Sequence, residues 1–213
     1  MYNRQHKEKK FWDKFARKYD SFVKNTVSKT YTEIIGQLGA ELNIQQHVLE
    51  IGTGTGIISF SICSKVSSII ATDISPEMIQ IAKQKQISSG SKNIDFQVQD
   101  SYHLTFPDKS FDMVIATNLL HLLYEPKKPI HEVKRVLKDQ GIFIAPTFCV
   151  GENFKSKAIA TIAGFFSGFR IVNKWTIENY NSLLTKNGFK IIKTSRIDGR
   201  LPMCYVVMKK ENK

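Results

Sequence analysis

The stretch Val48-Leu49-Glu50-Ile51-Gly52-Thr53-Gly54-Thr55-Gly56 decides the fold expected of this chain. A short, mostly apolar run predicts a buried strand, and three alternating glycines follow it at once. Glycine lets the backbone turn tightly and approach a ligand without an obstructing Cβ atom. Such a turn after the first strand of a parallel sheet is typical of a nucleotide-binding site.

On the carboxyl side of this turn, helix and strand patterns alternate. Strands are expected at 69–72, 94–98, 113–116 and 142–145, and helices at 57–65, 75–88 and 129–137. A helix at 176–186 and strands at 189–197 and 203–208 follow, and the link 198–202 is too short for a parallel crossover. The expected fold class is α/β: a doubly wound, mostly parallel seven-stranded sheet with helices on both faces and an antiparallel C-terminal β-hairpin.

Composition is ordinary for a soluble globular protein, with 42% hydrophobic and 23% charged residues. The charged N-terminal segment lacks the apolar run of a signal peptide, so a cytoplasmic location is expected. Three widely spaced cysteines, Cys63, Cys149 and Cys204, form no CxxC pair, and no metal site is expected. The net charge of +12 fits either an anionic partner or a simple lysine bias, because only 6 of the 31 basic residues are arginine.

Two nucleotide cofactors compete for the glycine-rich turn. A dinucleotide site requires G-x-G-x-x-G, but Ile57 stands at the third glycine position. Asp73, 21 residues after Gly52, suits the ribose hydroxyls of either cofactor. The terminal hairpin is not the usual end of a dinucleotide domain, so a nicotinamide-dependent oxidoreductase remains the alternative rather than the first choice.

Several segments in order resemble the motifs of class I S-adenosylmethionine (SAM)-dependent methyltransferases. Residues 48–56 look like their first motif, and Asp73-Ile74-Ser75-Pro76-Glu77-Met78 resembles the second. Gln99-Asp100-Ser101 with 106–114 resembles the third and fourth strand region, and 132–141 resembles the helix and turn before strand five. The resemblance covers residues 11–147 and is nearest to the ubiquinone/menaquinone and phospholipid group, whose Tyr-Asp motif resembles Phe15-Ala16-Arg17-Lys18-Tyr19-Asp20.

Two departures from the family pattern are visible. Thr53 stands where Cys or Ser is common, and Asp139-Gln140-Gly141 replaces the usual Pro-Gly-Gly.

This resemblance implies SAM as the cofactor and divides the chain into parts of one domain, 1–213. Residues 1–45 would be an N-terminal helical lid, 46–150 the SAM-binding core, 151–175 a substrate-lid insertion, and 176–213 the last helix and hairpin. In the core, Gly52, Thr53, Gly54 and Gly56 would form the loop beneath the methionine part, and Glu50 would hold its ammonium group through water.

The other cofactor contacts are implied in the same way. Asp73 would accept from the ribose hydroxyls as a charged group, which makes a stronger bond than a neutral one. The remaining positions are Ile74 and Met78 beside the adenine, Asp100 and the Ser101 N–H at the adenine amino group, and Asn118 and Leu119 at the sulfonium. Met78 fits an ordinary core position equally well.

Two residues are candidates for the chemistry. His121 follows Asn118 by three positions and is a tentative general base, although a histidine between two leucines also fits a partly buried helix residue. Tyr19 is a tentative contact to cofactor or substrate, and it fits the core as well.

The methyl acceptor is expected to be a small, apolar or aromatic molecule. No Asn/Asp-Pro-Pro-Tyr motif follows the fourth strand, where the chain reads Asn118-Leu119-Leu120-His121, so nucleic acid is disfavoured. The aromatic helix face formed by Phe11, Trp12, Phe15, Tyr19 and Phe22 and the apolar run 158–169, with Phe165, Phe166 and Phe169, would make an apolar pocket. A lipid or RNA substrate is the alternative, and Lys155, Lys157, Arg170 and Lys174 would suit weak contact with an anionic membrane. The sequence predicts no oligomeric state.

Overall fold

The computed structural model describes residues 2–154, 156, 158, 161 and 171–211. They belong to two compact units, Met1–Thr105 and Phe106–Lys213. The proposed lid run 158–169 lies outside the described residues except for Ala158 and Thr161, as do Lys155, Lys157 and Arg170. No helix of the described segments is long and apolar enough to cross a membrane.

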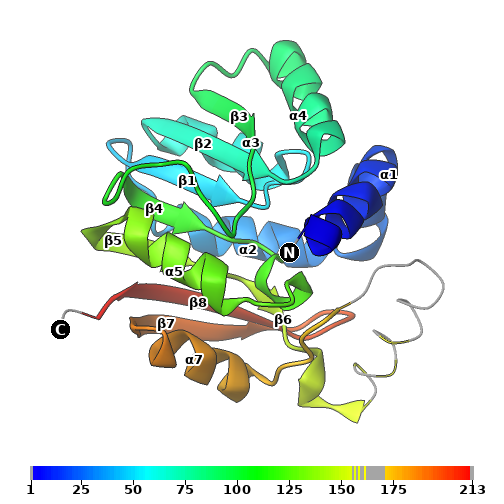
Figure 1. Cartoon of the computed structure of the whole chain (residues 1–213), viewed down its shortest axis with the longest axis vertical. Helices are drawn as coiled ribbons and strands as arrows, with labels where there is room; N and C mark the ends of the chain where they lie inside the picture. Colours follow the sequence, from blue (N-terminus) through cyan, green and yellow to red (C-terminus); the bar gives the residue numbers. More distant parts are fainter. Residues whose placement is uncertain (1, 155, 157, 159–160, 162–170, 212–213) are drawn as a thin grey trace. The chain divides into compact units, whose positions relative to one another are not determined.

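The first unit is built on three parallel strands in the order β3-β2-β1 (Figure 1). They are β1 (His47–Ile51), β2 (Ser68–Asp73) and β3 (Ile94–Val98). Ile51 lies opposite Thr72, and Asp73 lies opposite Val98. Because the strands are parallel, their carboxyl ends meet at one edge, where the glycine-rich turn and Asp73 both lie.

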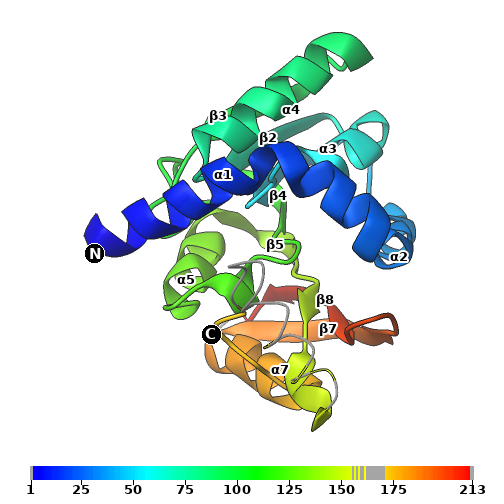
Figure 2. The same ribbon diagram turned by 90° about the vertical axis from the view of Figure 1, so that its right-hand side faces the viewer.

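Four α-helices surround these strands: α1 (Tyr2–Thr26), α2 (Ser28–Gly39), α3 (Ile57–Ile62) and α4 (Pro76–Ser89), with a 3-10 turn η1 (Cys63–Lys65) after α3. Helix α4 begins as its sequence predicts. Ser75 accepts a 3.2 Å hydrogen bond from the Met78 N–H, and Pro76 occupies the first helical position. Helix α1 packs against α4 (Figure 2), with Ala16 and Val23 buried.

The described part of the second unit contains five strands, which do not all run in the same direction. They are β4 (Phe111–Ile115), β5 (Leu137–Ile144), β6 (Thr147–Phe148), β7 (Phe189–Ile197) and β8 (Met203–Lys210). Strands β4 and β5 are parallel, whereas β8 runs antiparallel to β5, β6 and β7. The helical segments are η2 (Leu120–Leu122), α5 (Lys127–Val136), η3 (Val150–Glu152) and α7 (Ile177–Lys186), and α7 lies along the β7–β8 hairpin (Figure 2).

The predicted fold class is therefore confirmed, including the antiparallel terminal hairpin. The two-residue strand β6 was not expected, because two residues carry no readable periodicity. The Asp139-Gln140-Gly141 turn is absorbed into β5. Phe111 pairs with Leu137, but Met113 pairs with Ile142, so the intervening residues of β5 form an irregularity in the ladder.

Candidate cofactor-binding site

The glycine-rich turn needs glycine at each of its three positions for a backbone reason. Gly52, Gly54 and Gly56 have φ angles of 69°, 57° and 84°, a region that other residues rarely adopt. A Cβ atom on Gly54 would lie 3.2 Å from Cε1 of Tyr19. One on Gly56 would lie 2.8 Å from Cζ of Phe96. The turn is thus pressed between the strands and helix α1.

Glu50 is a buried carboxylate beneath this turn, with 1% of its surface exposed. Thr53 Oγ1 donates to it at 2.8 Å, and Ser59 Oγ donates to the same oxygen. Burial raises the pKa of Glu50 to about 7, and the nearby Asp73 adds to the rise, although the hydroxyl hydrogen bonds oppose it. A carboxyl group that titrates near neutral pH makes this turn a candidate functional site.

Asp73, at the end of β2, is held by two backbone donors. The Gly54 N–H donates to Oδ2 at 2.8 Å, and the Ser75 N–H donates to Oδ1 at 2.9 Å. Desolvation raises the pKa of Asp73 to about 6 despite these bonds, and the charge of Asp13 contributes. The structure therefore brings together the two features that the sequence singled out, the glycine-rich turn and the carboxylate one strand further on.

Helix α1 adds side chains to the same place. The Tyr19 ring lies against Gly54, and its hydroxyl is 3.1 Å from that of Tyr31. Burial raises the pKa of Tyr19 well above its usual value, and the Tyr31 hydroxyl adds to the rise, so the phenol stays protonated. Tyr19 therefore lies at the turn, as its tentative assignment requires.

The other predicted residues of the first unit lie near these loops. The Gln99 N–H donates to the Asp73 carbonyl at 3.0 Å, which brings the chain before Asp100 beside β2. Asp100 Oδ1 accepts from the Tyr102 N–H at 3.1 Å, and Ser101 between them is half-buried. Ile74 is half-buried as well, whereas Met78 is 1% exposed and packs as a core residue in this structure.

Asn118, Leu119 and His121 belong to the second unit. Asn118 adopts a left-handed φ of 55°, and its N–H donates to the Pro146 carbonyl at 2.8 Å. His121 is fully buried in η2, with Nδ1 3.0 Å from Thr147 Oγ1, and burial lowers its pKa to about 3. The imidazole is therefore neutral at physiological pH, and a group with such a pKa is a weak base. The general-base role of His121 stays a prediction.

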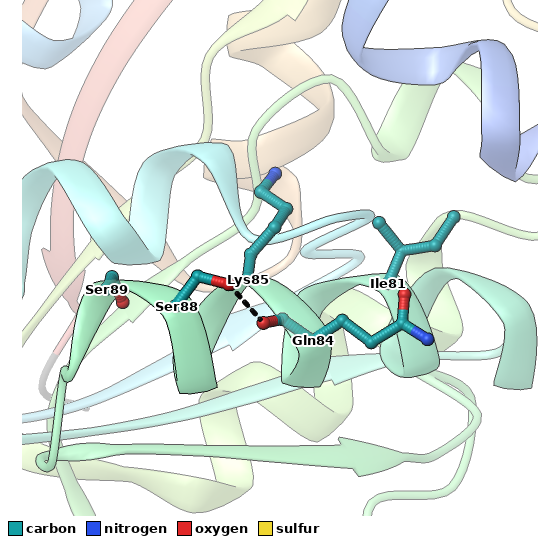
Figure 3. A pocket seen from close by; sticks show the side chains of 5 residues that line it. All are labelled: Ile81, Gln84, Lys85, Ser88 and Ser89. Atoms are coloured by element: carbon teal, nitrogen blue, oxygen red, sulfur yellow. Dashed lines mark hydrogen bonds between the residues drawn. The ribbon is translucent and has the colours of Figure 1, made fainter.

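A surface hollow of about 440 Å³ lies along α4 and is lined by Ile81, Gln84, Lys85, Ser88 and Ser89. In Figure 3 the Lys85 side chain extends away from α4, while Gln84 runs along the helix. The Lys85 ammonium group donates to Asp20 Oδ2 at 3.0 Å and to the Thr55 carbonyl at 2.8 Å. The Lys85 side chain therefore hydrogen-bonds to the glycine-rich turn. The hollow itself presents few polar groups that could converge on a ligand.

Comparison with known proteins identifies the family. Residues 43–188, more than half of the chain, match the sequence profile of a family described as a methyltransferase domain. The chain belongs to this methyltransferase family. This membership favours the methyltransferase interpretation over the nicotinamide alternative.

Individual relatives agree with the family. The methyltransferase is 31% identical over 221 residues to the uncharacterized protein MJ1252 of Methanocaldococcus jannaschii, covering 91% of this chain and 82% of that protein. It is 28% identical to the ubiquinone/menaquinone biosynthesis C-methyltransferase UbiE of Citrifermentans bemidjiense, covering 78% and 79%. It is thus a class I methyltransferase close to the group that includes UbiE.

The uncharacterized methyltransferase YcgJ of Bacillus subtilis is similar in sequence and in structure. Identity is 33% over 105 residues, which span 49% of this chain and only 42% of that protein. Its crystal structure superposes with a TM-score of 0.75 and 18% identity, covering 85% of this chain and 100% of the other. The superposition confirms the Rossmann-like fold.

Sequence reasoning missed several side chains of this candidate site. Asp13, Lys85 and Ser59 all contact the loops around Glu50 and Asp73, yet none was singled out as functional. The signal available for Asp13 was its spacing of seven residues from Asp20 on one helix. Lys85 lies 65 residues after Asp20, and no local pattern connects them.

Proposed function

We propose that this protein is a SAM-dependent methyltransferase that transfers a methyl group to a small, apolar or aromatic molecule. The observation that carries the proposal is the Asp73 carboxylate, oriented by the Gly54 and Ser75 N–H groups at the carboxyl ends of two parallel strands. Family membership supports methyl transfer, and the donor set supports an adenosyl cofactor.

The chemistry of these residues fits a ribose. Each carboxylate oxygen has about two acceptor positions, and the two backbone bonds to Asp73 use one on each oxygen. The acceptor capacity that remains on this carboxylate would serve the neighbouring hydroxyls of a ribose. The glycines of the turn carry no side chains of their own, so the backbone can come close to a ligand once Tyr19 moves away from Gly54.

When bound, SAM would supply an electrophilic methyl group on a cationic sulfur. Glu50 would hold the ammonium of its methionine part through water, above the turn formed by Gly52, Thr53, Gly54 and Gly56. Asp73 would hold the ribose diol. The protein's task would be to orient the acceptor and exclude water.

Four further residues would complete the cofactor contacts. Ile74 and Met78 would lie beside the adenine, and Asp100 with the Ser101 N–H would contact its amino group. Because Met78 is fully buried in this structure, its role requires a shift of α4 or of its own side chain. Asn118 and Leu119 keep the role at the sulfonium that the resemblance implies.

The nature of the acceptor is proposed from the aromatic side chains of α1. Phe15 contacts Phe11, Tyr19 and Phe22 at centroid distances of 5.9, 6.3 and 5.5 Å, so these rings form a continuous apolar stripe that begins beside Gly54. Tyr19 would thus link the cofactor loop to an apolar acceptor. His121 would act as a base only for an acceptor that is protonated at working pH.

Calorimetry with SAM and with NADH tests the cofactor. We expect SAM and its demethylated product to bind and NADH to give no signal. NADH binding without a response to SAM would refute the proposal and restore the oxidoreductase alternative.

Transfer of a labelled methyl group from SAM tests the acceptor. The panel contains quinols and other phenols, anionic phospholipid vesicles, and RNA. Label in a small aromatic product is the expected result. Label only in lipid or RNA would refute the small-molecule acceptor, and SAM binding without label in any acceptor of the panel would favour a SAM-binding protein without turnover.

A further inference from the structure

Helix α1 carries two aspartates on one face, Asp13 and Asp20. Seven residues make nearly two helical turns, so these carboxylates point the same way about 10 Å apart along the axis. Ala16 and Val23, which share that face, are buried. This face of α1 is therefore the one that packs against the rest of the first unit.

Asp20 is bonded to the glycine-rich turn. Its Oδ1 accepts from Thr55 Oγ1, and its Oδ2 accepts from Lys85 Nζ at 3.0 Å. Lys85 closes a triangle, because it also donates to the Thr55 carbonyl at 2.8 Å. The ammonium lies 5.6 Å from the centroid of the Phe60 ring, which adds a cation–π contact.

Asp13 is bonded to the loop after β2. Its Oδ1 accepts from Ser75 Oγ at 2.6 Å, and its Oδ2 accepts from Lys9 Nζ at 2.8 Å. The same Ser75 hydroxyl accepts from the Met78 N–H at the start of α4. Asp13 thus fixes the loop that leads from β2 into α4.

The contacts of α1 through Asp20 and Asp13 reach the two chain segments whose N–H groups orient Asp73. Thr55 directly follows Gly54, whose N–H donates to one oxygen of Asp73. Ser75 is itself the donor to the other oxygen. Between the two aspartates, the Tyr19 ring covers Gly54, so a ligand that approaches this face of the turn must move that ring or the helix that carries it.

We infer that the Asp20–Lys85–Thr55 triangle is a latch that holds α1 over the cofactor loops, and that Asp20 and Lys85 are positioning residues that govern cofactor exchange. The inference rests on the proposed function, because it names the regulation of the same site. Asp20 and Lys85 are 47% and 34% exposed, so their ion pair is screened by water and easily opened. An ion pair of this strength would hold α1 over the cofactor loops and still open often enough for the cofactor to leave.

The test compares Asp20→Asn, Lys85→Met and the double variant with the unchanged protein. Methionine keeps most of the apolar stem of Lys85. Lys83→Met is the matched control, because Lys83 is exposed on the same helix and forms no ion pair within the described part of the chain. Stopped-flow kinetics give the dissociation rate of SAM, and hydrogen–deuterium exchange reports the protection of peptides covering residues 9–26.

Each latch variant should release SAM about two- to fivefold faster and exchange α1 amides faster, and the double variant should match the single ones. The melting temperature should stay within about 2 °C of the unchanged protein. Raising the salt from about 0.05 M to about 0.5 M should speed release from the unchanged protein more than from Lys85→Met. Lys83→Met should behave like the unchanged protein.

Latch variants with the release rate and α1 exchange of Lys83→Met would overturn the inference. So would faster release accompanied by a matching loss of global stability, since that would indicate a merely structural pair. If the unchanged protein binds no SAM, the proposed function fails, and the exchange measurement on α1 still decides whether the latch exists.

Discussion

Two carboxylates at the glycine-rich turn of the first unit and two on the second unit are held in opposite ways. In the first unit, Glu50 and Asp73 accept hydrogen bonds from hydroxyls and backbone N–H groups, and burial raises their pKa values to about 7 and about 6. In the second unit, Asp139 lies 2.8 Å from Lys109, and that lysine lowers the pKa of Asp139. Glu132 similarly pairs with Arg135 at 2.8 Å.

The difference separates a functional arrangement from a structural one. A surface carboxylate that is paired with a cation is readily ionised, and the pair contributes little to the free energy of unfolding. A buried carboxylate without a cationic partner opposes folding when it is ionised, so its presence requires another reason. For Asp73, which the Gly54 and Ser75 N–H groups orient at the glycine-rich turn, the reason that we propose is ligand binding.

Replacement of Asp73 by Ala should have the largest effect. It removes a charged acceptor of two hydrogen bonds, each worth about 1.5–3 kcal/mol, so SAM affinity should fall at least about 100-fold. Asp139→Ala is the control, because it removes an exposed carboxylate that pairs with Lys109 and Lys210, and SAM affinity should not change. Titration calorimetry measures both. An Asp73→Ala variant with unchanged affinity would contradict the role assigned to this site.

Glu50→Gln should increase stability at pH 8. The pKa of Glu50 is raised from 4.5 to about 7, so the folded state holds a proton that the unfolded state has released. Stability therefore falls as pH rises from about 4.5 to about 7, and the neutral amide avoids this loss. The variant should gain about 3 kcal/mol at pH 8 and little at pH 4.5.

Urea denaturation at both pH values measures the effect of Glu50→Gln. Asp139→Asn is the counterpart in the second unit. Its pKa is lowered, so its contribution to stability is present above its unfolded pKa and is lost as pH falls. Opposite pH trends in the free energy of unfolding of the two variants would support the contrast between these carboxylates. A Glu50→Gln protein that is less stable than the unchanged protein at pH 8 would contradict it.

Gly54→Ala and Gly90→Ala separate backbone strain from crowding. Both glycines have positive φ, 57° and 66°, so alanine costs about 1–2 kcal/mol at either position. A Cβ on Gly90 meets nothing within 4 Å, whereas one on Gly54 presses on Tyr19. Thermal unfolding should show a further loss of about 1–2 kcal/mol for Gly54→Ala. Equal losses would mean that Tyr19 does not press on the turn.

The sequence was sufficient for the elements whose cause is local. The apolar run before Gly52 predicted β1, and Ser75-Pro76 predicted the start of α4, because strand periodicity and helix capping depend on a few adjacent residues. The pairing of Asp73 with the glycine-rich turn also followed, since carboxyl ends of parallel strands share one edge.

What the sequence could not give depends on contacts between distant segments. The bond between Asp20 and Lys85 joins residues 65 positions apart, and the crowding of Gly54 by Tyr19 depends on how α1 packs. The full burial of His121 is of the same kind. A histidine between leucines in the sequence is compatible with an exposed or a buried position. Only the tertiary packing places its side chain beside Thr147.

The smallest effect that we predict is a pH dependence of ligand affinity set by Asp73 alone. Only the ionised carboxylate can accept from both ribose hydroxyls, and its pKa is about 6. Affinity should therefore be constant above pH 7 and fall about tenfold between pH 8 and pH 5.

Adenosine is the suitable probe, because it presents the ribose diol without the amino acid part that Glu50 would contact. Fluorescence or calorimetric titration in the Glu50→Gln background then isolates Asp73. A flat profile would mean that the N–H donors already keep Asp73 ionised at pH 5 in the free protein, or that the diol does not bind there. Asp73→Asn distinguishes these outcomes, because it abolishes adenosine binding only in the first.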